Sequence, residues 1–369
     1  MNDPIIRTDI AIVGAGMAGA SLAAALAGSV RVVMLEAEDI AGYHSTGRSA
    51  AFWSETYGGP AVQPLTSASF AFLDGAGFLG ARGAVHLAAS GDAGHLDRLE
   101  AEFEGRVRLD RLDRSALEQL IPGLRLGYGE GLAEPSCRDI DVARLHAHYL
   151  AEARRAGADM RTRARLLSAD RVPGGWLLGT TAGQVRADLL VNAAGAWADE
   201  VAAMAGQRPL GIAPLRRTMV QLAVEPATRP DMPLVMDAAG LYYFKPEVGG
   251  RLWLSPHDET PVDPCDVAPE EIDVARAIDR LERVVDWTVA RKERAWAGLR
   301  SFAPDRVPVY GAADAESSFF WFAGQGGFGI QTAPAAAAIG AAMLLGRALP
   351  ESLGAIDPSR YRPGRFDGR

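Results

Sequence analysis

The hydrophobic pattern is most regular over the first 36 residues. Thr8–Val13 and Val30–Leu35 are short apolar runs of the kind that forms buried strands. Between them, Met17–Ala27 is a stretch of small residues with helical length, and Gly28 follows it. This succession of strand, helix and strand predicts a βαβ unit, and therefore a parallel sheet at the start of the chain.

The rest of the chain alternates between helical and strand-like patterns. Over residues 141–156, Leu145, Tyr149 and Leu150 fall on one face of an amphipathic helix, which Gly157 ends. Further helices are predicted at residues 65–73, 269–289 and 335–345. Strands are predicted at 165–191 as hairpins and at 189–195, 209–254 and 319–323, whereas a turn-rich loop is predicted at 298–311.

The chain length predicts two domains. It has 369 residues, 48% of them apolar, and roughly 150 residues make up one domain. The predicted fold class is α/β in two domains (α+β), with a Rossmann-like cofactor-binding domain and a mixed-sheet substrate domain. Nucleotide-type signals near both ends and in the middle place residues 1–50, 140–210 and 297–369 in the first domain and 51–139 and 211–296 in the second.

Charge and cysteine content argue against several classes of protein. The net charge is −8 with acids and bases interspersed, whereas nucleic-acid binding needs a basic face. Cys137 and Cys265 lack metal-ligand spacing, so we expect two reduced thiols and no metal site. Met1–Asp9 lacks the apolar core of a signal peptide, and Ala335–Leu345 is shorter than the about 18 apolar residues of a membrane span. We expect a cytoplasmic protein and leave open peripheral contact with the inner membrane face.

The segment Gly14-Ala15-Gly16-Met17-Ala18-Gly19 matches the G-x-G-x-x-G motif between a predicted strand and helix. The first glycine permits a tight turn, the second lets a pyrophosphate approach the backbone, and the third lets helix and strand pack closely. Glu36 follows Gly14 by 22 residues, where a carboxylate accepts hydrogen bonds from a ribose 2′-hydroxyl. The motif indicates a dinucleotide without distinguishing NAD from FAD; a packing turn beside a solvent-facing glutamate is the weaker alternative.

Four further segments suit contacts with a cofactor. Hydroxyls, a glycine and Arg48 make Ser45–Ala50 suitable for a second grip on a pyrophosphate, with a polar surface loop as the alternative. Val191–Trp197 runs from an apolar strand into small residues, which would let a flat ring lie against the backbone. The other two are 298–311 and the glycine-rich 324–332, where Thr332 is suited to cap the last helix.

Together these segments resemble one family. The matching stretches are Gly42–Ala51, Val191–Trp197, Trp296–Phe302 and Gln325–Thr332. They resemble the D-amino-acid oxidase and glycine/sarcosine oxidase family of FAD enzymes, and within it the bacterial catabolic D-arginine dehydrogenases. The resemblance spans nearly the whole chain and implies an FAD domain plus a substrate domain whose β-sheet covers the flavin.

The resemblance also implies noncovalent FAD. Some relatives attach flavin through a cysteine near residues 298–302, and none stands there in this chain. Glu36 is implied to bind the adenosine ribose, and residues 45–51 and 326–331 to line the pyrophosphate and flavin. The implied cofactor-binding residues are Gly14, Gly16, Ala18, Gly19, Glu36, Ala37, Ser45, Thr46, Gly47, Arg48, Ser49, Ala50, Ala51, Leu166, Gly195, Gly326, Gly327, Phe328, Gly329, Ile330 and Gln331.

A substrate site is implied by the same resemblance. Arg217 and Arg300 correspond to a carboxylate clamp, since a guanidinium pairs with a carboxylate through two hydrogen bonds. Tyr57 and Tyr243 complete the clamp, and the Gly327 carbonyl accepts a hydrogen bond from the substrate nitrogen. Tyr57, Tyr243 and Arg300 are the implied catalytic residues; solvent or either tyrosine is the expected proton acceptor.

Two positions depart from the D-arginine dehydrogenases. Phe52 stands where those enzymes carry a histidine, and Ala84 where they carry the glutamate that pairs with the substrate guanidinium. A buried cation without a counter-charge is costly, so we expect an apolar or aromatic D-amino acid rather than D-arginine or D-lysine. Asp237 and Glu247 are the alternative sources of a counter-charge.

The expected function is FAD-dependent oxidative deamination of a D-amino acid to a 2-oxo acid and ammonia, with hydride passing from Cα to flavin N5. Oxidation of secondary amines and related substrates, such as sarcosine, glycine or proline, is the first alternative. An FAD-binding subunit of an electron-transfer complex is the second, and a nicotinamide-binding protein the third. The electron acceptor is left open between a quinone and oxygen.

Overall fold

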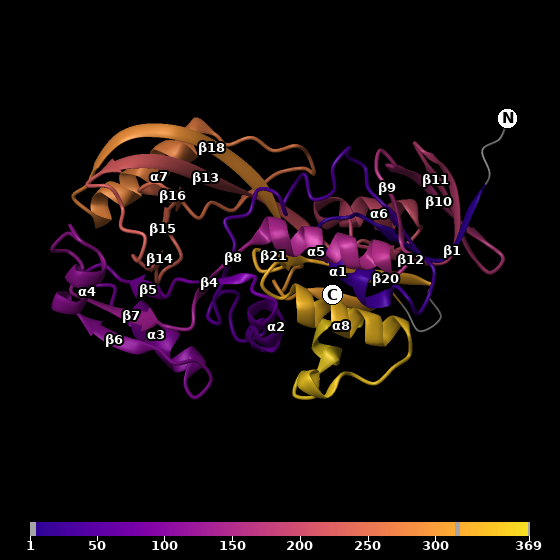
Figure 1. The fold of residues 1–369 in the computed structure, drawn as a ribbon, viewed down its shortest axis with the longest axis horizontal. Coiled ribbons are helices and arrows are strands. Elements are labelled where there is room, and N and C mark those ends of the chain that lie inside the picture. The colour runs from indigo at the N-terminus through magenta and orange to yellow at the C-terminus, as the bar shows by residue number, and fades with distance from the viewer. Residues whose placement is uncertain (1–4, 314–317, 368–369) are drawn as a thin grey trace.

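The predicted βαβ unit forms the centre of the first of two large sheets. In the computed structural model, which describes residues 5–313 and 318–367, the two sheets lie at opposite ends of the molecule (Figure 1). The first has the order β10-β11-β12-β1-β2-β9, with β20 beside β12 and β19 beside β20. Its strands are β1 (Ile6–Val13), β2 (Val32–Leu35), β9 (Asp159–Arg161), β10 (Leu166–Val172), β11 (Gly175–Thr180), β12 (Gly183–Asn192), β19 (Val309–Ala312) and β20 (Phe319–Ala323).

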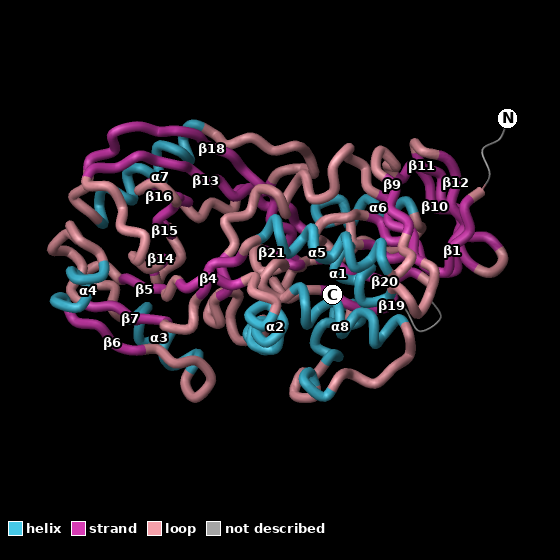
Figure 2. The backbone as a smooth tube through the Cα atoms, in the orientation of Figure 1, coloured by secondary structure: helices cyan, strands magenta, loops and turns pink. Residues whose placement is uncertain are grey.

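Helices cover both faces of this sheet because alternate side chains of β1 point to opposite sides. Ile10 and Ile12 pack into the core shared with α1 (Met17–Leu26) and α8 (Ala333–Leu344), while Ala11 and Val13 pack toward α6 (Ala198–Met204). α1 also contacts α5 (Val142–Arg155), and Figure 2 shows these helices in the middle of the molecule. The predicted strand, helix and strand are thereby confirmed, with boundaries shifted by at most two residues.

The second sheet has ten strands among the described residues, in the order β21-β18-β13-β16-β15-β14-β5-β7-β6, with β17 beside β13. Helix α7 (Glu271–Val284) packs on β13, β16 and β18, and α3 (Gly94–Phe103) and α4 (Arg114–Leu120) pack on β7. The strands are β5 (Ala84–Leu87), β6 (Asp110–Asp113), β7 (Glu130–Glu134), β13 (Ala213–Glu225), β14 (Leu234–Asp237), β15 (Tyr243–Glu247), β16 (Arg251–Ser255), β17 (Thr260–Pro261), β18 (Thr288–Phe302) and β21 (Gln325–Gly326).

The long strand β18 corrects two predictions. The helix predicted at 269–289 ends at Val284, and the loop predicted at 298–311 begins as the last part of β18. Glycine at 298 and arginine at 300 suggested a loop, but β13 pairs with β18 along its whole length, from Ala213 opposite Phe302 to Glu225 opposite Thr288. A distant partner strand therefore overrides the local composition. The predicted division of the chain at 296/297 falls inside this strand.

A small three-stranded sheet lies between the two large ones. Its strands are β3 (Phe52–Trp53), β4 (Leu79–Ala81) and β8 (Arg138–Ile140). Helix α2 (Gln63–Gly75) packs on α8. No helix of the described residues is long and apolar enough to cross a membrane.

Candidate active site

A cavity of about 280 Å³ extends between the two large sheets. One end lies at the carboxyl ends of β1 and β2, where ligands of parallel sheets usually bind, and the other lies under β13, β15 and β18. Its wall includes most of the implied cofactor residues, namely Gly14, Gly16, Ala18, Glu36, Ala37, Ser45, Thr46, Arg48, Ser49, Ala50, Leu166, Gly195, Gly326, Gly327, Gly329 and Ile330.

The glycine-rich turn has the close approaches that its motif predicts. A Cβ on Gly14, whose φ is +100°, would lie 2.5 Å from the Ala193 carbonyl oxygen. A Cβ on Gly19 would lie 1.9 Å from the Gly14 carbonyl oxygen. Gly14 and Gly19 thus let strand, turn and helix pack without side chains, while Gly16 faces the cavity at the N-terminus of α1.

Glu36 is buried beside this turn rather than facing solvent. Its Oε2 accepts a hydrogen bond from the Ala15 N–H at 3.0 Å, and its Oε1 accepts one from the Glu38 N–H at 3.0 Å. The Ala15 carbonyl bonds in turn to Nε2 of His146, at 2.9 Å. Burial lowers the pKa of His146. Sequence analysis missed this histidine, whose only signal was its place on the amphipathic helix α5.

Residues 45–48 connect the cofactor end of the cavity to the second sheet. Thr46 Oγ1 accepts a hydrogen bond from the Met17 N–H at 2.9 Å, and Ser45 donates to the Leu299 carbonyl at 2.6 Å. The Arg48 guanidinium donates to the Ala297 and Val267 carbonyls at 3.2 and 2.9 Å and is paired with Asp266. Arg48 lines the cavity with its guanidinium already paired, and its contact with a pyrophosphate stays a prediction.

Five implied cofactor residues lie outside the cavity wall: Gly19, Gly47, Ala51, Phe328 and Gln331. Gln331 is buried, and its amide bonds to Ser54, Tyr57 and Thr66. Its side chain therefore fastens the segment that carries Tyr57. The Phe328 ring lies 6.5 Å from the Tyr57 ring, so it packs behind the substrate end instead of facing a cofactor.

The implied substrate residues converge at the other end of the cavity. On the paired strands β13 and β18, Arg217 is opposite Gly298 and Arg300 is opposite Leu215, so the two arginines are diagonal neighbours on one face. Arg300 donates to the Tyr57 hydroxyl and, at 3.3 Å, to the Tyr243 hydroxyl. The prediction that these four side chains share one site is consistent with this geometry.

Arg217 is buried with an unused donor. Its Nε donates to the Asp258 carbonyl at 2.8 Å and its Nη2 to Glu259 at 3.1 Å. Its Nη1 is buried and meets no acceptor at bonding distance among the described residues. A buried donor of this kind is costly to leave unpaired, so this end of the cavity suits an anion.

The two guanidinium groups also determine the ionisation of their neighbours. Burial and the nearby Arg300 lower the pKa of Arg217. Burial would raise the pKa of Tyr57, but the charges of Arg300 and Arg217 outweigh it, and the pKa lies below the ordinary phenol value. Positive charge thus dominates the site, which favours a carboxylate ligand.

Gly327 is close to the clamp. A Cβ at this position would lie 2.4 Å from Nη1 of Arg300 and 2.8 Å from the Tyr57 hydroxyl oxygen. Only glycine leaves these two groups where they are. This steric requirement places the 325–330 loop directly against the substrate end of the cavity.

Phe52 and Ala84 lie behind the tyrosines, outside the cavity wall. The Phe52 ring is 5.1 Å from the Tyr57 ring and 5.8 Å from the Tyr243 ring. Ala84 is buried in the same apolar cluster. Neither alternative counter-charge reaches the cavity wall, because Asp237 bonds to the Leu241 N–H and Glu247 to the Val248 N–H.

His257 is a neighbour of this site that the sequence did not reveal. Its backbone has φ of +54°, its Nδ1 bonds to the Gly240 carbonyl, and its ring lies 5.8 Å from that of Tyr243. Burial, together with Arg217 and Arg300, lowers the pKa of His257 to about 2, so the ring is neutral. Among residues 5–313 and 318–367, no group of three or more His, Cys, Asp or Glu side chains is placed to hold a metal ion.

Comparison with known proteins identifies a family. The family model described as FAD dependent oxidoreductase (DAO) matches residues 9–343. Dimethylglycine dehydrogenase of Mus musculus is 29% identical over 68% of the chain, although the match spans only 31% of that relative. Glycine oxidase of Pseudomonas aeruginosa is 26% identical over 66% of the chain and 64% of its own length.

A solved structure confirms the predicted fold class. The crystal structure of glycine oxidase from Geobacillus kaustophilus superposes with a TM-score of 0.84 at 23% identity, covering 98% of this chain and 99% of that one. The family model over residues 9–343 confirms the family resemblance, whereas the narrower resemblance to D-arginine dehydrogenases stays a prediction.

Proposed function

The chain belongs to the FAD dependent oxidoreductase family DAO, and from this premise we propose that it oxidises the carbon–nitrogen bond of a small amino acid. The buried, unused Nη1 of Arg217 beside Arg300 carries the proposal. A substrate carboxylate would satisfy this donor and the excess positive charge together. No neutral or cationic headgroup would do both.

The cofactor end of the cavity fits FAD. Gly16 lines the cavity at the N-terminus of α1, where a phosphate would bind, and Glu36 is held at the end of β2 by two backbone N–H groups. Gly326, Gly327 and Gly329 bring backbone against the middle of the cavity. Bound there, FAD supplies the hydride acceptor for the oxidation.

The chain's own residues would bind and orient the substrate. Arg217 and Arg300 would hold the carboxylate. Tyr243 lines the same cavity, while Tyr57 lies outside its wall and accepts a hydrogen bond from Arg300. Fixing the headgroup in this way fixes the neighbouring C–H bond relative to the rest of the cavity. Arg300 and Arg217 lower the pKa of Tyr57 and so favour its phenolate, which is the form of this side chain that could accept a proton from the amine.

The packing behind the tyrosines favours a small substrate. Phe52 packs against the rings of Tyr57 and Tyr243 from behind, so neither ring can move back to make room for a large side chain. The relatives named as a dimethylglycine dehydrogenase and a glycine oxidase also suggest small substrates. We therefore place glycine and its N-methylated forms first.

A D-amino acid with an apolar side chain is the second candidate. Met219 lies in the cavity wall and belongs to the same apolar cluster as Phe52 and Met236, so an apolar side chain would meet apolar neighbours. D-arginine and D-lysine are disfavoured because neither Asp237 nor Glu247 lines the cavity and Glu259 is already paired with Arg217 and Arg306.

Anaerobic bleaching of the flavin absorbance separates these substrates. The panel contains glycine, sarcosine, dimethylglycine, both prolines, and D- and L-alanine and phenylalanine. Bleaching by glycine or its N-methyl derivatives supports the first candidate, and bleaching by D- but not L-alanine or phenylalanine supports the second. If no amino acid bleaches the flavin while a carboxylate-free amine does, the proposal is wrong.

A further inference from the structure

Glu259 places a carboxylate beside the carboxylate clamp. Its Oε1 accepts hydrogen bonds from Nη2 of Arg217 at 3.1 Å and from Nη2 of Arg306 at 2.7 Å. Arg217 lines the cavity, whereas the Arg306 side chain is 52% exposed. The glutamate thus bridges a guanidinium inside the substrate site and one at the surface.

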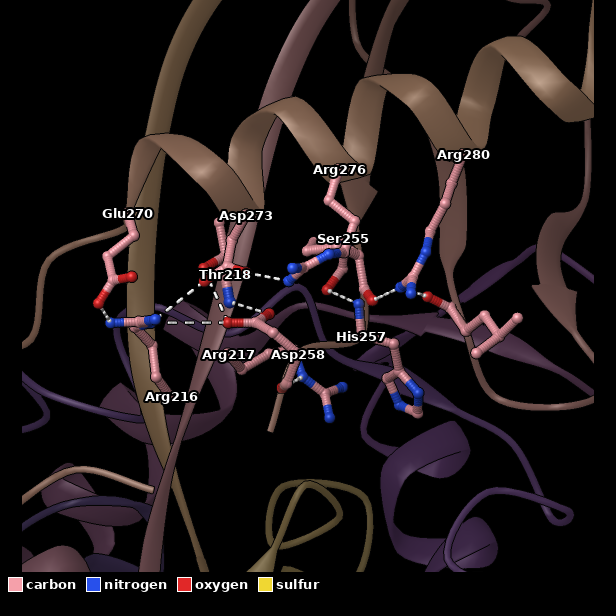
Figure 3. A network of polar contacts seen from close by, with 12 residues as sticks. Arg216, Arg217, Thr218, Ser255, His257, Asp258, Glu270, Asp273, Arg276 and Arg280 are labelled. Carbon is pink, nitrogen blue, oxygen red and sulfur yellow. Dashed lines mark hydrogen bonds and ion pairs between the residues drawn. The ribbon is translucent and has the colours of Figure 1, made fainter. Parts of the chain in front are cut away.

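The segment that carries Glu259 is held in place by a polar network (Figure 3). The Asp258 carboxylate accepts hydrogen bonds from the Thr218 N–H at 2.7 Å and its hydroxyl at 2.9 Å. The Asp258 carbonyl oxygen accepts a hydrogen bond from Nε of Arg217. Figure 3 shows Arg216 beside this group, reaching Asp273 at 2.9 Å. The backbone just after Glu259 pairs with β13 through Thr260 and Pro261.

Arg306 is equally fixed. Its backbone has φ of +63°, a conformation that non-glycine residues seldom adopt. Its guanidinium carbon lies 3.8 Å from the centre of the Phe302 ring. Both partners of Glu259 are therefore held by contacts of their own, and the carboxylate position is built into the fold rather than sampled by a mobile side chain.

Counting charges shows what this position does. Arg217, Arg300 and Arg306 supply three positive charges, and Glu259 supplies one negative charge. One substrate carboxylate on Arg217 and Arg300 is the second anion of the group. A second carboxylate that reached Nη2 of Arg217 would meet Glu259, which already accepts a hydrogen bond from that nitrogen, and like charges at close range are strongly disfavoured.

We infer that Glu259 is a specificity-determining residue, which occupies the position that a second substrate carboxylate would take and so restricts the site to monocarboxylates. This inference rests on the proposed function, because it assumes that the clamp binds the substrate carboxylate. It predicts that neutralising Glu259 turns a monocarboxylate site into one that also accepts dicarboxylic amino acids.

The variant Glu259→Gln tests it, since the amide oxygen can still accept hydrogen bonds from both arginines without the charge. Anaerobic flavin reduction is measured with sarcosine against iminodiacetate and with D-alanine against D-aspartate; each pair differs by one carboxylate. In Glu259→Gln, the ratio of rate constant over Kd for the dicarboxylate to that for the monocarboxylate should rise at least about tenfold. A ratio within about twofold of the wild-type value overturns the inference.

A matched control is available on the same sheet. Glu293 also bridges two arginines, Arg251 and Arg291, but neither of them lines the cavity, whereas Arg217 does. Glu293→Gln should leave the ratio unchanged, and an equal rise there would contradict a local effect. Adding Arg306→Gln to Glu259→Gln should cancel the gain, because it removes the cation that the new carboxylate would meet.

Binding measurements separate this inference from the proposed function. Acetate and malonate titrations of the FAD-bound protein, followed by the flavin absorbance, need no turnover. Glu259→Gln should favour malonate over acetate at least about tenfold more than wild type, even if no tested amino acid reduces the flavin. If Glu259→Gln does not fold, the same titrations are made on Arg306→Glu, at a position that is exposed. This variant should bind acetate more favourably relative to malonate than wild type does, and an unchanged preference would refute the inference.

Discussion

Replacing Arg300 by methionine tests the carboxylate clamp most directly. Methionine keeps an unbranched apolar stem but removes the donors to Tyr57 and Tyr243 and one of the two guanidinium groups at the end of the cavity. Hydrogen bonds to charged groups contribute about 1.5–3 kcal/mol each. Losing one such contact at the upper end of this range weakens carboxylate binding by about 100-fold or more.

The same substitution should change the ionisation of Tyr57. In the wild-type protein burial opposes ionisation, and the charges of Arg300 and then Arg217 outweigh it, so the pKa is lowered. Without Arg300 only Arg217 opposes the effect of burial, and the pKa of Tyr57 should rise. A step in the rate of flavin reduction that depends on this hydroxyl should therefore move to higher pH.

Anaerobic stopped-flow reduction of the flavin measures both effects, because it gives a Kd and a limiting rate constant at each pH. Arg291→Met is the control, since Arg291 lies on the same strand and is 71% exposed at its side chain. Flavin should remain bound in both variants. If Arg300→Met has the wild-type Kd and pH profile, Arg300 is not part of the clamp.

Three further substitutions test the site and the buried Glu134, which accepts hydrogen bonds from Ser54 and Thr56 just before Tyr57. Gly327→Ala should push Arg300 and the Tyr57 hydroxyl out of place and slow flavin reduction by about 100-fold while FAD stays bound; wild-type reduction would contradict the steric reading. Phe52→Ala should cost about 3 kcal/mol of unfolding free energy and allow aromatic D-amino acids to reduce the flavin, and an unchanged substrate panel would show that Phe52 does not limit size. Burial would raise the pKa of Glu134, but His86, Thr56 and Ser54 lower it below the ordinary 4.5. The ionised Glu134 therefore stabilises the fold above about pH 4.5, and this stabilisation is lost as the pH falls through the lower pKa of the folded state. Glu134→Gln should therefore reduce stability at neutral pH by about 2 kcal/mol and weaken its decrease in acid, which urea unfolding at several pH values measures; parallel curves for both proteins would refute this.

Local sequence determines the cofactor end of the molecule. The βαβ unit, the roles of Gly14 and Gly19 and the position of Glu36 follow from spacing and from the need for close backbone packing. The predicted helices at 65–73 and 141–156 correspond to α2 and α5 for the same reason, since their apolar periodicity is contained in one segment. These features required no knowledge of distant parts of the chain.

Features that depend on distant partners were missed. The local pattern predicts a loop in the last part of β18, because its partner strand, β13, lies some 80 residues earlier. The direction of the Arg48 side chain depends on Asp266, and the burial of Gln331 depends on Ser54 and Thr66. His257 and Glu259 carry no local signal, since only the folded sheet brings them to the arginines.

The pairing of β18 with β21 has a mechanical consequence. Ser301 and Phe302 pair through their backbones with Gly326 and Gln325, so the strand that bears Arg300 and the glycine loop beside the cavity form one ladder. This pairing joins the two halves of the molecule, so they cannot rotate apart about a hinge at this point. Arg300 and the glycine loop should therefore keep their relative position when a substrate enters the cavity.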